Sequence, residues 1–205
     1  MSIVTYNNRS IANISAIPGA AKSLIHIKTL TASSSSTLSF VDGSDDVVLD
    51  STYPIYMFKY IGIHPATDGA QFQVGFRDGD TNYDATKTST FFKSQNREDG
   101  AGGSIGYETS HDLAQGTGFQ NLTQDIGNDN DQSISGELFI FNPSSTTFVK
   151  HFIAKSNSSA SNDRSFNDFI AGYCNVTAAI DAVQFKMSSG NMDAGTIKLY
   201  GLKDS

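Results

Sequence analysis

The sequence predicts an all-β fold: a single jelly-roll-like sandwich of two antiparallel sheets with a short N-terminal arm. Three observations lead to this prediction. Sustained helical periodicity is missing, short apolar or alternating segments recur, and clusters of Gly, Asn, Asp and Ser separate them; this is the pattern of β-sandwiches and barrels. The 205 residues suit one domain, or one domain plus an arm. A concanavalin-like sandwich is the near alternative.

Ten segments are expected to form strands. In one of them Phe72, Val74 and Phe76 share a face, and in the last segment Ile197 and Leu199 do the same. Alternation with a period of two places one face of a strand on a core and the other in water. The ten expected strands are 23–30, 37–41, 53–63, 71–77, 88–93, 133–141, 147–155, 166–174, 180–187 and 195–202.

The segments between these strands contain explicit turn residues. Asp42-Gly43, Asp68-Gly69 and Asp78-Gly79 supply the positive φ that tight turns need. Residues 95–130 differ, because they are rich in Gly, Asn and Asp and carry few strand signals. A loop of that length in a compact domain is usually functional or disordered. We therefore expect residues 21–205 to form one sandwich with one long loop.

Residues 1–20 precede the first convincing strand and contain more large apolar side chains than a disordered tail should have. We expect them to form an arm that packs on a neighbouring subunit; an extra edge strand is an equal alternative. A second candidate interface lies in 138–141, which is apolar on both faces and is expected to be a central strand or one covered by a partner. Together these segments predict a homo-oligomer, with a trimer favoured. The candidate interface residues are Ile3, Val4, Tyr6, Ile11, Ile14, Ile17, Phe139 and Phe141.

Charge and composition exclude several classes of function. The net charge is −7 and the 14 Lys and Arg are scattered singly, whereas nucleic-acid binding needs a basic stripe. The sequence contains no run of 18 apolar residues, so no membrane span is predicted. The N-terminus lacks the pattern of a signal peptide. Charged residues make up only 17% of a chain with 27 Ser and 17 Thr, which is typical of an extracellular surface. A virion protein, made in the bacterial cytoplasm and released by lysis, reconciles these features.

The residues give no indication of catalysis. His111-Asp112 is the one adjacent His–carboxylate pair, but nucleophilic catalysis also needs a nucleophile and an orienting group. Glu98 and Glu108 share the long loop, yet a glycosidase needs two carboxylates held across a cleft. None of the histidines has a metal-ligand spacing, and we expect those within strands to be structural. We therefore expect no enzyme and no cofactor. The histidines are His26, His64, His111 and His151.

Two acidic loops raise the question of calcium. The segment 78–82 begins like an EF-hand, but Tyr83 stands where the motif needs Gly and Ser89 where it needs Glu. Residues 128–131 could also supply oxygen ligands. Solvated turns are the expected role of both loops. The glycine-rich segment 100–106 lacks the Lys-Ser/Thr of a phosphate loop.

Two further features concern single side chains. The only cysteine, Cys174, ends an apolar run, and we expect it to be an inert thiol in the core because free Cys behaves as a small hydrophobe. Sugar binding favours exposed aromatic rings, but Trp is absent and the chain has 8 Tyr. Tyr83 and Tyr107, both beside loops, are the candidate aromatics for a host-surface glycan.

Three blocks of the sequence resemble short structural proteins of tailed bacteriophages, especially phages of marine and freshwater bacteria. The first block reads YMFKYI at 56–61 and continues through PATDG to FQVGFR at 72–77. The second reads SGELFIFNP at 135–143. The third, SGNMDAGTIKLYGL at 189–202, is the most distinctive and resembles a turn that leads into a closing strand. The first 50 residues lie outside the resemblance.

The resemblance implies a non-enzymatic structural component on the outer surface of a tailed-phage virion. Such a protein would be a capsid decoration protein or a short surface or tail attachment protein, with other virion proteins as partners. The alternative is a tail-fibre or baseplate-tip adhesin that binds a host-surface glycan. The family offers no shared catalytic residues that could be transferred to this chain.

Overall fold

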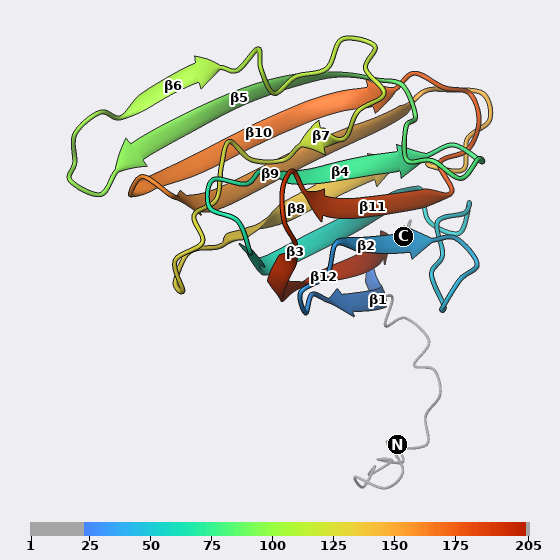
Figure 1. Cartoon of the computed structure of the whole chain (residues 1–205). Coiled ribbons are helices and arrows are strands. Elements are labelled where there is room, and N and C mark those ends of the chain that lie inside the picture. Colours follow the sequence, from blue (N-terminus) through green and yellow to red (C-terminus); the bar gives the residue numbers. More distant parts are fainter. Residues whose placement is uncertain (1–22, 204–205) are drawn as a thin grey trace, which may run out of the picture.

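The structure is a computed structural model that describes residues 23–203. Within this range the chain forms twelve strands and no helix. The strands make an eight-stranded sheet and a four-stranded sheet, which pack face to face (Figure 1). The prediction of an all-β sandwich of two antiparallel sheets is therefore confirmed. The arm expected at 1–20 lies outside the described residues.

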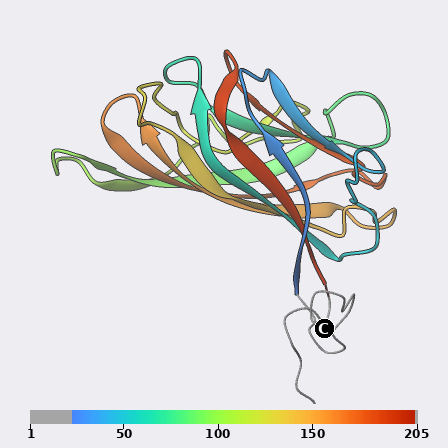
Figure 2. The ribbon, with the colours of Figure 1, turned by 90° about the horizontal axis from the view of Figure 1, so that it is seen from below.

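The large sheet combines strands from the whole length of the described chain. In spatial order its strands are β1 (Leu24–Thr31), β12 (Met192–Leu202), β3 (Ile55–Pro65), β8 (Ile134–Phe141), β9 (Lys150–Ala160), β10 (Arg164–Cys174), β5 (Lys87–Arg97) and β6 (Ser104–Tyr107). The small sheet contains β2 (Thr37–Val41), β11 (Ala182–Met187), β4 (Phe72–Arg77) and β7 (Gln120–Asn121). Figure 2 shows β1 (blue) beside β12 (red), and β1 is an edge strand of the large sheet.

The antiparallel pairs are nested along the chain. β1 pairs with β12, β2 with β11, β3 with β8 and β4 with β7. The first four strands also alternate between the two sheets. The hairpin of β9 and β10 and the hairpin of β5 and β6 then extend the large sheet beyond β8. The small sheet therefore faces only part of the large one.

The core between the sheets is dominated by aromatic side chains. Phe40, Phe58, Phe72 and Phe185 are fully buried, with ring centroids 5.2 Å apart for Phe40 and Phe58 and 5.5 Å apart for Phe72 and Phe185. Phe72 and Phe185 come from strands whose inward positions alternate with polar or small residues, whereas Phe58 comes from β3, which also carries the apolar Met57 and Ile61 between its inward positions. Burial of one large apolar side chain contributes about 1.5–3 kcal/mol.

Two expectations about strand limits need correction. The region 95–130 is not one loop, because β5 continues to Arg97 and both β6 and β7 lie inside the region. The strand expected at 147–155 instead covers Lys150–Ala160. The second half of this strand could not be recognised from the sequence, because its buried positions are occupied by Ser156 and Ser158 and not by apolar residues.

Candidate functional site

The outer face of the large sheet carries most of the exposed apolar side chains. Seven large apolar side chains are exposed among residues 23–203, and six of them belong to strands of this sheet. The seventh, Phe148, lies between β8 and β9. Apolar side chains that gather on one face indicate an interaction surface, whereas isolated ones need no explanation. The six are Leu24, Ile61, Phe92, Ile105, Tyr107 and Ile153.

The strand register arranges this face into rows, because directly opposed residues project from the same side of a sheet. We call the first row the apolar row; it consists of Tyr200, Met57, Phe139, Ile153 and Ala171. Ile153 is 50% exposed. A hollow of about 460 Å³ lies over this row and is lined by Ile153, Ala171 and Tyr173 among others. The apolar row therefore presents a shallow apolar surface, to which Met57 contributes little because it is only 5% exposed.

Two residues farther along the strands runs a second row, which we call the charged-aromatic row. One half carries charged groups and the other half carries aromatic rings. The row consists of Lys198, Lys59, Glu137, Lys155, Phe169, Phe92 and Tyr107.

The aromatic half of this row, which we call the aromatic platform, consists of Phe169, Phe92 and Tyr107 on adjacent strands. The rings of Phe92 and Phe169 stack with centroids 4.9 Å apart and planes inclined by 8°. Lys155 Nζ lies 5.4 Å from the centroid of the Phe169 ring, a cation–π contact. Phe92 and Tyr107 are 45% and 52% exposed. The Tyr107 hydroxyl donates a hydrogen bond of 2.5 Å to Asp112 Oδ2, and this bond raises the pKa of Tyr107.

The charged half of the row has more positive than negative groups. Glu137 lies between Lys59 and Lys155 in the register, and its Oε2 is 3.8 Å from Lys59 Nζ. Lys198 stands directly opposite Lys59, and like charges in that position are destabilising. Three lysines and one glutamate give this row a local excess of positive charge in a chain whose net charge is −7.

A third row, the polar row, follows after two more residues along the strands and consists of Ser135, Asn157, Asn167, Ser94 and Ile105. Asn157 Nδ2 donates to the Phe166 carbonyl at 2.7 Å and to Ser165 Oγ at 3.1 Å. A hollow of about 400 Å³ joins Lys59 and Lys155 to Asn157 and Asn167. A second hollow of about 500 Å³ adjoins it at Ser135 and Asn157.

The residues predicted as sites fall in different places. Tyr107 lies in the charged-aromatic row and Phe139 in the apolar row, while the half-buried Phe141 lies beside Ile55 on the same face. β8 is a central strand, as its two apolar faces predicted. The arm candidates Ile3, Val4, Tyr6, Ile11, Ile14 and Ile17 lie outside the described residues.

Tyr83 is not part of this face. It lies between β4 and β5, where it packs against the small sheet. A Cβ atom added at Gly75 would come within 2.9 Å of Tyr83 Cβ and 2.7 Å of the Phe119 ring. Because Gly75 has no side chain, Tyr83 and Phe119 can pack directly on β4. Tyr107 lies in β6 of the large sheet, so Tyr83 and Tyr107 do not form one site.

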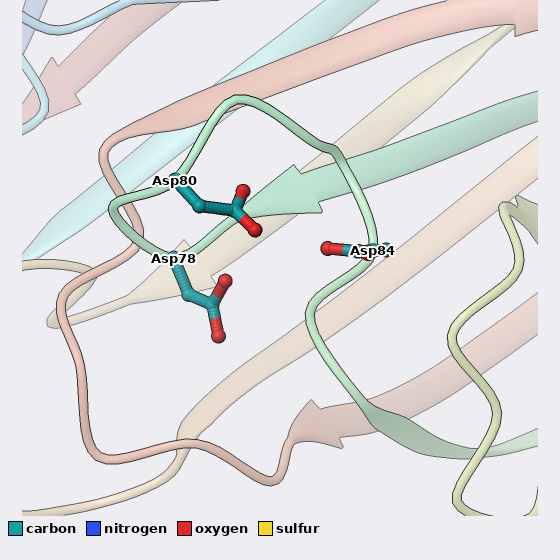
Figure 3. Close-up of side chains that lie close together, drawn as sticks. All are labelled: Asp78, Asp80 and Asp84. Atoms are coloured by element: carbon teal, nitrogen blue, oxygen red, sulfur yellow. The ribbon is translucent and has the colours of Figure 1, made fainter.

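The acidic loop between β4 and β5 brings three carboxylates together. Figure 3 shows Asp78, Asp80 and Asp84 around the space that the loop encloses, and one oxygen of each lies within 4.8 Å of the others. Oxygen ligands of this kind suit Ca²⁺. Asp80 Oδ1 also accepts a hydrogen bond of 2.6 Å from the Asn82 backbone, so a solvated turn explains part of the arrangement. Residues 128–131 contribute no ligand to this group.

A buried polar cluster inside the sandwich was missed by the sequence analysis. Asp168 projects inward from β10 and is fully buried, and this burial raises its pKa to about 7. Its Oδ2 accepts a hydrogen bond of 3.1 Å from the Gln124 backbone, while its Oδ1 has no partner among the described residues. Lys93 lies nearby and pairs with Glu108 at 2.9 Å. The sequence feature that could have revealed this buried carboxylate is the alternation in β10, where Asp168 falls on the same face as the apolar residues Phe166 and Ile170.

The histidines and carboxylates considered for catalysis have other contacts. His111 Nδ1 lies 2.8 Å from Ser110 Oγ, whereas Asp112 accepts its hydrogen bond from Tyr107. The two side chains are therefore not arranged as a His–carboxylate dyad, and burial lowers the pKa of His111. Glu108 is paired with Lys93, and Glu98 lines the 500 Å³ hollow.

The remaining histidines make local contacts. His26 Nε2 lies 2.8 Å from Thr29 Oγ1, and His64 Nδ1 lies 2.8 Å from the Gln132 carbonyl oxygen. His151 faces outward beside Tyr173, with ring centroids 6.1 Å apart. The rings of His26 and His64 thus have hydrogen-bond partners within the chain, whereas His151 is exposed.

Cys174 is a free cysteine buried in the core, as predicted. Burial raises the pKa of its thiol to about 12, which keeps it in the unreactive neutral form. Cys174 is paired with Lys87 on the neighbouring strand β5 and with Lys150 on the neighbouring strand β9. Both lysines are fully buried, and burial lowers their pKa values. Lys150 Nζ donates to the carbonyls of Ser145 and Val176 at 3.1 and 2.8 Å.

Comparison of the chain with protein-family models, with curated proteins and with solved structures gave no match. In the described part of the chain, no helix is long and apolar enough to cross a membrane. The strongest candidate for a functional surface is therefore the outer face of the large sheet, because it combines exposed apolar side chains, unbalanced charge and adjoining hollows.

Proposed function

We propose that this protein is a non-enzymatic structural component on the outer surface of a tailed-phage virion. It acts there as a capsid decoration protein or as a short surface or tail attachment protein, and its partners are other virion proteins. The observation that carries the proposal is the gathering of exposed apolar side chains on one face of the large sheet. A protein that must attach to a particle needs such a face.

The apolar row is the proposed attachment surface. Specific interfaces bury about 1,200–2,000 Å² in total, and their fully buried centres are depleted of charge and enriched in aromatic residues and Met. Phe139 and Ile153 match that composition, and Tyr200 extends the row toward β1. Met57 lies between Tyr200 and Phe139 in the register but is only 5% exposed. We propose a homo-oligomer, with a trimer favoured, in which residues 1–20 contact a neighbouring subunit.

The resemblance to phage structural proteins supports the same surface. Its blocks at 56–61, 135–143 and 189–202 fall mainly on β3, β8 and β12, which are adjacent strands of the large sheet. The remaining block, 72–77, is β4 of the small sheet. The resemblance therefore covers the strands that carry Tyr200, Met57 and Phe139, three of the five residues of the apolar row.

We also infer that the sandwich is a jelly roll. A jelly roll is a two-sheet, eight-stranded fold built from two Greek keys. Its support is the nested pairing of β1 with β12, β2 with β11, β3 with β8 and β4 with β7. On this assignment, the two additional hairpins are insertions that enlarge one sheet.

Incorporation into particles tests the proposed function. Ile153→Asp places a charge in the middle of the apolar row, so the variant should remain folded but be lost from purified phage particles. Thr37→Asp, at an exposed position of the small sheet, is the matched control and should be retained. Cryo-electron microscopy should locate the native protein on the particle. Equal incorporation of both variants, or particles that lack the native protein, would contradict the proposal.

A second candidate function is a tail-fibre or baseplate-tip adhesin that binds a host-surface glycan. The observation in its favour is the aromatic platform of Phe169, Phe92 and Tyr107 next to the hollow at Asn157 and Asn167. Ligand sites typically combine aromatic walls with a few polar groups that fix orientation.

A further inference from the structure

We propose that the charged-aromatic row and the polar row together bind an acidic polysaccharide that lies across the strands of the large sheet. The inference deepens the adhesin form of the proposed function and rests on it. It names the ligand class and assigns a role to each part of the surface.

Charge complementarity is the first argument. Lys198 and Lys59 are directly opposed, an arrangement that costs stability unless an anion lies between them. Glu137 is the single acidic member of the row and is already shared between Lys59 and Lys155 in the register. The carboxylate or sulfate group of a sugar would relieve the repulsion between the two lysines.

The aromatic platform supplies the second argument. A sugar ring has an apolar face, and Phe92 and Tyr107 expose about half of their surface at the end of the row opposite to Lys198. Tyr107 has an apolar ring and a hydroxyl held by Asp112, so its orientation is fixed before a ligand arrives. The Phe169 ring is already covered by Phe92 and Lys155, so Phe92 and Tyr107 would contact the sugar rings while the lysines hold their acidic groups.

The polar row and the length of the charged-aromatic row also suit a polysaccharide. Asn157 and Asn167 line the hollow that also contains Lys59 and Lys155. The Asn167 amide can donate hydrogen bonds to sugar hydroxyls and accept hydrogen bonds from them, whereas Asn157, whose Nδ2 already donates to Phe166 and Ser165, can accept through its Oδ1. The charged-aromatic row crosses seven strands, which at a strand spacing of about 4.8 Å corresponds to ~29 Å. That length suits a chain of several sugars rather than a single one.

A direct binding measurement tests the proposal with the full chain. The probes are an oligogalacturonate, a heparin-derived oligosaccharide, a neutral dextran of matched length and a single-stranded oligonucleotide. We expect at least one acidic oligosaccharide to bind and the dextran not to bind. We also expect binding to weaken as salt rises, because exposed charges are screened.

Variants then locate the site. Lys59→Ala with Lys198→Ala, and separately Tyr107→Ala, should each lower the affinity at least ~10-fold. Lys186→Ala on the small sheet is the matched control and should bind as the native chain does. The proposal is overturned if neither acidic probe binds, if dextran binds equally well, if the oligonucleotide binds more tightly, or if the variants leave the affinity unchanged.

Particle incorporation separates this inference from the function on which it rests. The lysine double variant should still be incorporated into particles, because in the adhesin form the protein attaches through residues 1–20 and the outer face of the large sheet stays free for the ligand. Normal incorporation with no binding of acidic sugars would remove only the glycan inference. Failure of the native protein to appear on particles would remove the proposed function and leave the binding result to stand alone.

Discussion

Asp168 is the residue whose position is hardest to reconcile with a simple apolar core. A buried carboxylate loses its hydration, and only hydrogen bonds or opposite charges can compensate for that loss. One oxygen of Asp168 accepts the Gln124 amide at 3.1 Å. The lysine nearby, Lys93, is shared with Glu108 and Gln124. The result is a carboxyl group that retains its proton near neutral pH.

The pH dependence of stability tests this description. Burial, opposed by the Gln124 hydrogen bond and Lys93 and reinforced by Asp125 and Glu108, raises the pKa of Asp168 to about 7. Between about pH 4 and pH 7 the folded state therefore holds a proton that the unfolded state releases. Stability should fall as pH rises through this window, by up to ~1.4 kcal/mol per pH unit, and then level off.

Asp168→Asn should remove that part of the slope. In urea unfolding at pH 5 and pH 8, the variant should gain stability relative to the native chain at the higher pH. Asp131→Asn, at an exposed site, is the control and should follow the native chain at both values. A constant difference between Asp168→Asn and the native chain would show that the carboxyl group does not titrate in this window.

Leu199 tests the burial of the last strand. Its side chain is fully buried from β12, as is that of Ile197. Leu199→Ala should destabilise the fold by about 2–5 kcal/mol, because it removes apolar contacts and leaves a cavity. Thr196→Ala, outside the core, should change the free energy of unfolding by less than ~0.5 kcal/mol. Denaturant unfolding of both variants measures the difference, and equal small effects would place β12 outside the core.

At the scale of elements, strands with clean alternation could be predicted from the sequence and irregular ones could not. β4 and β11 were expected within one or two residues, because their inward positions are consistently apolar. β6 was missed since it is an exposed edge strand with no buried side chain. β7 has only two residues, too few to produce a period. Of the candidate surface, Tyr107 and Phe139 could be named, but their rows depend on a register between distant strands.

The contact between β10 and its neighbours leaves no room for a side chain at Gly172. A Cβ atom there would lie 2.6 Å from the Thr88 carbonyl oxygen and 2.7 Å from the Phe152 ring. Gly172→Ala should therefore force the strands apart and destabilise the fold by about 1–3 kcal/mol. Gly106→Ala in β6 is the matched control, because nothing lies within 4 Å of its Cβ position. Similar thermal melts of both variants would contradict this packing.

At the scale of the whole molecule, the two sheets present different outer surfaces. The large sheet exposes six large apolar side chains, whereas no strand of the small sheet exposes one within residues 23–203. The sandwich therefore has a side suited to association and a side suited to water. This asymmetry gives the proposed virion component a defined orientation, with the large sheet toward its partners or its ligand.

The arm provides the test of assembly. Among the described residues, the buried members of the core lie within 32–199, and we expect the sandwich to fold without residues 1–20. Those residues carry Ile3, Val4 and Tyr6 among their apolar side chains, and we expect them to bind a neighbouring subunit. Deletion of 1–20 should preserve the strand-rich circular dichroism spectrum and the thermal melt but convert the proposed homo-oligomer to a monomer.

Light scattering after size-exclusion chromatography measures that change in mass, and particle incorporation measures its consequence. A second variant replaces Ile11, Ile14 and Ile17 with Ser in the full-length chain. This variant keeps the length of the arm but removes apolar side chains, so it separates the effect of those side chains from the effect of length. Loss of assembly in both variants would identify apolar contacts of the arm as the cause. If the deleted chain assembles and enters particles as the native chain does, the arm is only a local strand, and the outer face of the large sheet must carry the association alone.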